Sequence, residues 1–199
     1  MQIYIFLLVI LQKNKIKKMN PIVSVIMGST SDLPVLEKGL AFLDEMEIPF
    51  EMNALSAHRT PELVEEFAHN AEARGIKVII AAAGMAAHLP GVIAAMTPVP
   101  VIGIPVKSGS DGMDALLSIV QMPPGIPVAT VGMNNALNAA ILAAQILAVG
   151  DAQIAKRFVA YKEGLKKKSL LPLAVSIWAT IFSMSIPSFT SNFPKSSFW

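Results

Sequence analysis

Short apolar runs alternate with stretches of helical spacing through the middle of the chain. Five apolar runs are strand candidates, at residues 22–27, 49–55, 78–83, 99–104 and 128–131. Helical spacing or composition predicts helices at 34–46, 62–74, 115–121, 138–148 and 151–168, with a short one opening at 88–91. Apolar strands that alternate with helices are typical of a parallel sheet covered on both faces. The pattern predicts an α/β protein with three layers, α/β/α, around a central parallel sheet.

The two ends of the chain differ in composition from the middle. Residues 1–18 carry an apolar run and four lysines with no acid, and residues 166–199 carry four more lysines with no acid. The middle, 19–165, holds the other eight basic residues and all 14 acidic ones, which gives it a net charge of −6. We therefore expect an N-terminal extension at 1–18, either non-native or disordered, one domain at 19–168, and an apolar tail of unassigned structure at 169–199.

The formal net charge of +2 is a poor guide to partners because the excess lies in the two ends. A nucleic-acid-binding face needs basic side chains gathered on the folded body, so we expect no nucleic-acid partner. The apolar run at 3–11 is too short to cross a bilayer, which takes about 20 residues, and its lysines follow it, unlike those of a secretory signal. The stretch at 170–186 contains Pro172 and several serines. For that tail a marginal membrane anchor stays open beside a frame-shifted end or a segment that packs on a partner subunit.

Cysteine is absent from the chain. Its absence excludes disulfides, thiol nucleophiles and metal sites with cysteine ligands, and it fits a reducing compartment, so we expect a cytoplasmic protein. The chain has three histidines and no His-Glu-x-x-His spacing, so we expect no dedicated metal site. One of them, His69, lies in a predicted helix among acidic and amide side chains and is assigned no role.

Ligands of an open parallel sheet bind beyond the carboxyl ends of its strands, so the turns after the strands are searched first. Residues 28–34 read Gly-Ser-Thr-Ser-Asp-Leu-Pro. Free amides and hydroxyls at a helix N-terminus favour an anion such as phosphate, whereas an aspartate there suits sugar hydroxyls. The turn alone is a weak signal, because Ser31 or Asp32 could simply cap the helix and no Gly-x-Gly-x-x-Gly pattern is present.

Two further turns carry histidine. Residues 56–61 read Ser-Ala-His-Arg-Thr-Pro, where Arg59 offers a planar set of donors for phosphate and His58 is a residue type that passes protons near neutrality. An exposed His-Arg pair is equally often solvated surface. Residues 83–91 read Ala-Gly-Met-Ala-Ala-His-Leu-Pro-Gly, and their small side chains let a ligand approach the backbone. There His88 either contacts a ligand or caps and packs.

The order and spacing of these turns resemble the N5-carboxyaminoimidazole ribonucleotide mutase family of purine biosynthesis, in its bacterial and plant type. The segments that carry the resemblance are 28–32, 56–61, 86–91 and 118–130, which includes Ser-Ile-Val-Gln-Met-Pro at 118–123. The similarity covers about residues 21–165 and neither end. It implies a flavodoxin-like or Rossmann-like fold, a homo-octamer, and an isomerase that works on a small ribonucleotide substrate without ATP, metal or biotin, and so without a cofactor.

The resemblance also implies roles for single residues. The family moves a carboxylate from the exocyclic N5 of its substrate to ring carbon C4, and the histidine that matches His58 is the general acid and base. The other positions carried over are Ser29 and Arg59 at the phosphate, Asp32 at the ribose hydroxyls, and Ser56 and His88 as residues that line the site.

Two departures from the family pattern leave the substrate preference open. Met85 stands where the family often has a second glycine, and 131–135 is shorter than the usual loop; we expect both near the pocket. Two other functions also stay open. One is a carboxylase that uses carbon dioxide and aminoimidazole ribonucleotide directly, and the other is a non-catalytic protein that binds a phosphorylated ligand.

Overall fold

The computed structural model describes residues 20–166. The expectations for the extension at 1–18 and the tail at 169–199 therefore lie outside the described residues. The chain divides into two compact units between Phe158 and Val159. The first holds the whole sheet and its covering helices, and the described part of the second, 159–166, is helical.

Five parallel strands form one sheet in the order β2-β1-β3-β4-β5. Their bounds are Val23–Met27 for β1, Phe50–Ala54 for β2, Val78–Gly84 for β3, Val101–Val106 for β4 and Ala129–Thr130 for β5. Every residue of β1 and β4 is buried, as expected of strands covered on both faces. The predicted parallel sheet is confirmed, and its strand order is that of flavodoxin-like proteins.

The helices alternate with the strands along the chain, as the sequence pattern predicts. Their bounds are Leu33–Glu45 for α2, Pro61–Asn70 for α3, Leu89–Met96 for α4, Met113–Val120 for α5 and Ala136–Ala148 for α6, and residues 152–166 are helical as well. The predicted helix at 62–74 ends early, because the chain turns after Asn70 and Gly75 adopts a φ of +85°. Among residues 20–166, no helix is both long and apolar enough to cross a membrane.

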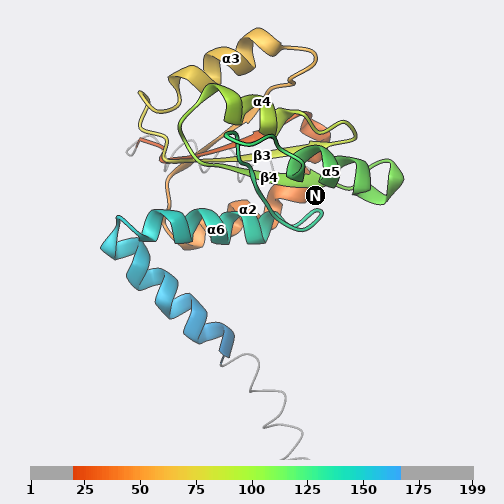
Figure 1. The fold of residues 1–199 in the computed structure, drawn as a ribbon. Helices are drawn as coiled ribbons and strands as arrows, with labels where there is room; N and C mark the ends of the chain where they lie inside the picture. The colour runs from red at the N-terminus through yellow and green to blue at the C-terminus, as the bar shows by residue number, and fades with distance from the viewer. Residues whose placement is uncertain (1–19, 167–199) are drawn as a thin grey trace, which may run out of the picture. The chain divides into compact units, whose positions relative to one another are not determined.

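Two helices cover one face of the sheet and three pack on the other. Figure 1 shows α2 and α6 on one side of the strands and α3 and α4 on the opposite side, where Ala115 and Ile119 of α5 join the same core cluster. Neighbouring residues of one strand serve different layers: Val25 faces α2 and α6, and Ile26 belongs to the core under α3 and α4. The three-layer arrangement is confirmed.

The alanine-rich helix α6 packs closely against α2 within this chain. A Cβ atom added to Gly39 of α2 would lie 2.6 Å from the carbonyl oxygen of Ala136. The two backbones can therefore approach this closely only because Gly39 has no side chain. The alanines of α6 at 139, 140, 143 and 144 are fully buried. Small side chains along α6 therefore allow close packing against a helix of the same chain.

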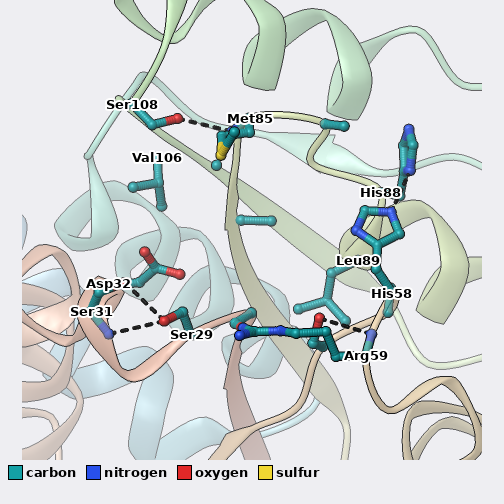
Figure 2. A pocket seen from close by; sticks show the side chains of 16 residues that line it. Ser29, Ser31, Asp32, His58, Arg59, Met85, His88, Leu89, Val106 and Ser108 are labelled. Carbon is teal, nitrogen blue, oxygen red and sulfur yellow. Dashed lines mark hydrogen bonds between the residues drawn. The ribbon is translucent and has the colours of Figure 1, made fainter.

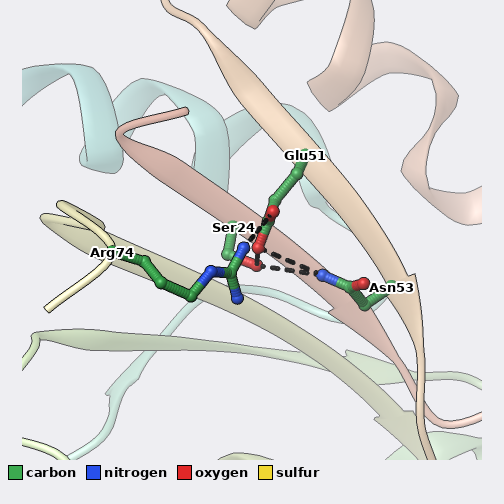
Figure 3. Close-up of polar contacts among 4 residues, drawn as sticks. All are labelled: Ser24, Glu51, Asn53 and Arg74. Carbon is green, nitrogen blue, oxygen red and sulfur yellow. Dashed lines mark hydrogen bonds and ion pairs between the residues drawn. The ribbon is translucent and has the colours of Figure 1, made fainter. Parts of the chain in front are cut away.

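A polar cluster joins the edge strand β2 to β1 and to the turn after α3 (Figure 3). Ser24, fully buried in β1, donates its hydroxyl hydrogen to Glu51 Oε1 at 3.0 Å. Asn53 donates to the same oxygen at 3.2 Å, and the guanidinium of Arg74 pairs with the other carboxylate oxygen of Glu51. Glu51 is therefore the common acceptor of three donors from three segments.

Removing that acceptor should destabilise the fold without touching the candidate site. We expect Glu51→Ala to lower the free energy of unfolding by about 1–3 kcal/mol, because the buried hydroxyl of Ser24 loses its close acceptor. Urea unfolding followed by circular dichroism measures the change. Glu65→Ala, at an exposed position of α3, is the matched control and should stay within about 0.5 kcal/mol of the parent. Equal unfolding midpoints for both variants would contradict the role given to Glu51.

Candidate active site

The strand order places a ligand site between β1 and β3. From β1 the sheet continues to β2 on one side, and from β3 it continues to β4 on the other, so the connections diverge at this point. Open α/β sheets bind ligands in the crevice outside the carboxyl ends of their strands at such a switch point. A cavity of about 540 Å³ lies there, a size suited to a small ligand.

All six residues singled out from the sequence line this one cavity (Figure 2). They come from the turns after three different strands: Ser29 and Asp32 after β1, Ser56, His58 and Arg59 after β2, and His88 after β3. His69 is exposed on α3 and is not among the lining residues. The fold therefore brings together, in one cavity, residues from these turns that are up to 59 positions apart in the chain.

The first turn presents serine hydroxyls and a carboxylate that is not used for capping. Ser29 caps a single 3₁₀ turn, Thr30–Asp32, by accepting from the backbone N–H of Ser31 at 3.3 Å, and the hydroxyl of Ser31 lies 2.9 Å from that of Ser29. Asp32 occupies the N-cap position of α2 but makes no capping hydrogen bond with its side chain. The interpretation of Ser31 or Asp32 as the cap is therefore wrong, because a 3₁₀ turn precedes α2 and the side chain that caps this turn is Ser29.

Partial burial changes the ionisation of Asp32. Burial raises the pKa of its carboxyl above the usual value, and hydrogen bonds with the Ser29 backbone and the Ser31 side chain oppose this shift. The carboxylate consequently takes up a proton at a less acidic pH than an exposed aspartate does. When ionised, it can accept hydrogen bonds from two neighbouring hydroxyls of a sugar.

The second turn holds the guanidinium of Arg59 against the first. Ser56 fixes the turn, since its backbone N–H donates to Thr60 Oγ1 at 3.0 Å and its own Oγ accepts from the Arg59 N–H at 3.3 Å. The guanidinium then donates to the carbonyl oxygen of Gly28 at 3.1 Å, at the end of β1. A guanidinium has five N–H donors, so most of them stay available to an anion in the cavity.

The third turn brings His88 to His58. The two imidazoles meet with 2.8 Å between His58 Nε2 and His88 Nδ1, and their planes are nearly perpendicular, at 84°. His88 stands at the N-cap position of α4 without a capping bond from its side chain. Of the two interpretations left open for this residue, the cap is wrong, and the ring lies against the other histidine of the cavity.

Sequence reasoning missed Ser108, which lines the cavity from the turn after β4. Its hydroxyl oxygen accepts from the backbone N–H of Met85 at 2.9 Å (Figure 2). A search of the turn after the fourth predicted strand could have found it, because Ser108 lies two residues beyond the end of β4.

Of the two departures from the family pattern, only Met85 lines the cavity. Its φ is +55°, a backbone conformation that favours glycine, and its side chain is 66% exposed. The segment 131–135 is absent from the lining residues and is held at the end of β4, where the side chain of Asn134 accepts from the backbone N–H of Lys107 at 2.8 Å. The segment therefore lies beside the cavity without lining it, because Lys107 stands between the lining residues Val106 and Ser108.

The cavity combines donors for an anion with groups that exchange protons. One guanidinium, one carboxylate, two imidazoles and several hydroxyls share it with the small side chains Ala57, Ala83 and Ala86. Within residues 20–166, no three His, Cys, Asp or Glu side chains gather in a way that could hold a metal ion. The arrangement suits a phosphorylated sugar and a proton transfer by histidine.

These features define a flavodoxin-like α/β protein with a cavity at its switch point whose lining suits a phosphorylated ligand. Residues 22–168 match the family model described as AIR carboxylase, and the chain belongs to this family. The N5-carboxyaminoimidazole ribonucleotide mutase of Pyrococcus abyssi is 56% identical over 148 residues, which cover 74% of this chain and 85% of that protein.

Two further comparisons give the breadth of the similarity. The phosphoribosylaminoimidazole carboxylase of Candida glabrata is 55% identical over 149 residues, which are 74% of this chain but only 26% of that longer protein. The crystal structure of Treponema denticola PurE superposes with a TM-score of 0.69 at 34% identity, covering 75% of this chain and 94% of that one. The family resemblance stated from the turns is confirmed.

Proposed function

We propose that this protein is an isomerase of purine biosynthesis that converts N5-carboxyaminoimidazole ribonucleotide into 4-carboxy-5-aminoimidazole ribonucleotide. The observation that carries the proposal is the convergence of His58, Arg59 and Asp32 on one cavity at the switch point of the sheet. The name of the Pyrococcus abyssi relative supports the same reaction.

The two turns after β1 and β2 bind the ribose phosphate in this proposal. Arg59 and the hydroxyl of Ser29 hold the phosphate, because a guanidinium bound to a phosphate forms charge-assisted hydrogen bonds. Asp32 accepts from the ribose hydroxyls, and its carboxylate is not engaged in capping α2. Ser56 and His88 complete the lining around the imidazole ring.

The chemical step uses His58 first as an acid and then as a base. Protonation of N5 breaks the bond between N5 and the carboxylate carbon and releases carbon dioxide inside the cavity. The enamine-like C4 attacks that carbon, and His58 then takes the proton from C4, so the histidine ends as it began. Such proton transfers contribute about 10²- to 10⁴-fold to a rate. Carbon dioxide must stay trapped, which requires a cavity that excludes bulk water once substrate is bound.

Two other functions are alternatives to the proposal, and the first has a specific observation behind it. The carboxylase name of the Candida glabrata relative supports direct carboxylation of aminoimidazole ribonucleotide by carbon dioxide, with the same histidine. A non-catalytic protein that binds a phosphorylated ligand would use the same anion site, and it follows if His58 lacks the geometry for proton transfer. The first alternative differs from the proposal in its substrate, and the second differs in having no turnover.

Feeding the two substrates separately distinguishes these functions. We expect formation of 4-carboxy-5-aminoimidazole ribonucleotide from N5-carboxyaminoimidazole ribonucleotide without ATP or added metal, and much slower formation from aminoimidazole ribonucleotide at low bicarbonate. Product is measured by chromatography in both arms. Turnover in the second arm alone would establish the carboxylase in place of the isomerase. Ligand binding with turnover in neither arm would leave the non-catalytic function.

The proposal extends to assembly and location. We propose a homo-octamer in the cytoplasm, acting on a small-molecule ribonucleotide. Exposed apolar side chains on α5, Met113, Leu117 and Val120, recur at spacings of four and three residues and support an interface with other subunits. Light scattering of the full chain tests the octamer.

A further inference from the structure

The contact between the two histidines of the cavity is a hydrogen bond with one proton. His58 Nε2 and His88 Nδ1 are 2.8 Å apart, a distance that two ring nitrogens reach only if one of them carries the hydrogen and the other accepts it. The rings stand at 84° to each other with their centroids 5.0 Å apart, so they meet edge on and do not stack. The bond therefore ties the protonation of one ring to that of the other.

The backbone of His88 and the ring of His58 are held by different hydrogen bonds. The backbone of His88 is fixed from both sides, because its N–H donates to the Ala86 carbonyl at 2.8 Å and its own carbonyl accepts from Val92 at 2.9 Å, in the first turn of α4. The next residue, Leu89, is 2% exposed and anchors that turn in the core. His58 lies in the turn between β2 and α3, and within residues 20–166 its ring has His88 as its one hydrogen-bond partner.

We propose that His88 is a positioning residue for His58: through this hydrogen bond it sets the orientation and the tautomer of the His58 ring. Its kinetic consequence rests on the proposed function, whereas the hydrogen bond itself does not. The bond occupies Nε2 of His58 and Nδ1 of His88, so the nitrogens left to exchange protons are Nδ1 of His58 and Nε2 of His88.

The pair supplies both protonation states that the proposed reaction needs. When His88 Nδ1 donates, Nε2 of His58 accepts, and the one N–H proton of neutral His58 is on Nδ1, which is then the acid. When His58 Nε2 donates, Nδ1 of His58 is bare and is a base. Passage from the second state to the first takes up one proton at His58 Nδ1, moves the bridging proton to His88, and releases one from His88 Nε2. The total number of protons on the pair is unchanged.

Few other charges bear on this pair from within the cavity. Among the described lining residues, the remaining ionisable side chains are Asp32 on the turn after β1 and Arg59, which follows His58 in the chain. The guanidinium of Arg59 is turned to the Gly28 carbonyl. A change in the pH profile after substitution of His88 alone is therefore attributed to the loss of the hydrogen bond to His58.

Labelling with [¹⁵N]histidine reads the tautomer directly, because the chain has three histidines and each signal is assigned by one substitution. We compare His88→Phe, which removes the hydrogen bond, His88→Gln, which can restore one, and His69→Phe, which changes the exposed histidine of α3 as a matched control. Solid-state ¹⁵N spectra of the free protein are recorded beside kcat, KM and the pH profile of kcat/KM with N5-carboxyaminoimidazole ribonucleotide.

Support for the proposal consists of two results. In His88→Phe the ring nitrogens of His58 change their shifts toward a mixture of tautomers, and kcat falls by on the order of 10²-fold with KM little changed and a shifted pH profile. His88→Gln recovers part of both effects, and His69→Phe matches the parent. Unchanged His58 shifts in His88→Phe would overturn the proposal, as would a rise in KM alone, which marks a residue that binds substrate. If the parent protein itself has no turnover, the proposed function fails while the spectra still decide the positioning role.

Discussion

We expect His58→Asn to lower kcat for the isomerisation by at least about 10²- to 10⁴-fold while substrate binding persists. The reason is that both proton transfers, to N5 and from C4, are assigned to the same imidazole, and a carboxamide has no proton to give or accept at neutral pH. Asparagine keeps a polar side chain of smaller size, so the hydroxyls of the first turn and Arg59 still hold the phosphate. Stopped-flow product analysis gives kcat, and calorimetry gives the dissociation constant.

A matched substitution separates the chemistry from effects on folding. His69→Asn changes an exposed histidine of α3 outside the cavity, and its kcat should equal that of the parent. Turnover of His58→Asn within a few-fold of the parent would contradict the acid–base role. Loss of both turnover and substrate binding in that variant would also contradict it, because it would make His58 a binding residue.

The strands and the edge of the sheet that carries the cavity were predictable because local pattern and one general rule suffice for them. Apolar runs identify strands of a sheet that is covered on both faces, and the turns after parallel strands all lie at one edge. That rule is independent of strand order, so it places the turns of Ser29, His58 and His88 at one edge of the sheet, whereas their assignment to a single site came from the family resemblance.

The contact between His58 and His88 depends on strand order and could not be predicted in the same way. Their turns follow β2 and β3, which are not neighbours in the sheet, because β1 lies between them. The two histidines are 30 positions apart in the chain, and the sequence between them carries no signal of a 2.8 Å contact. The contact depends on how distant parts of the chain pack together, and the hydrophobic periodicity of the sequence gives no information on that packing.

Local backbone geometry explains the smaller misses. The cap at Ser29 depends on a 3₁₀ turn of three residues, which the sequence pattern of a helix N-terminus does not distinguish from the helix itself. The predicted strand at 128–131 shrinks to Ala129–Thr130, because this edge strand pairs only with Ile102 and Gly103 of β4. Both cases concern the ends of elements, where one hydrogen bond decides the boundary.

We expect Arg59→Ala to weaken substrate binding by about 1.5–3 kcal/mol, or about 10- to 150-fold in Kd, with a smaller effect on kcat. Arg59 is the only cationic side chain among the described residues that line the cavity, apart from the histidines. Its guanidinium is already oriented by the Gly28 carbonyl, so little freedom is lost when phosphate binds to the remaining N–H groups.

A lysine at position 59 distinguishes charge from geometry. Arg59→Lys keeps the positive charge but loses the planar fork that binds two phosphate oxygens while it donates to Gly28, so its Kd should lie between those of the parent and of Arg59→Ala. Calorimetry with inorganic phosphate and with the ribonucleotide measures the three proteins. An unchanged Kd in Arg59→Ala would show that hydroxyls and amides of the first turn suffice for the phosphate. Equal Kd values for lysine and arginine would show that charge alone, without the oriented guanidinium, accounts for the contribution of this position.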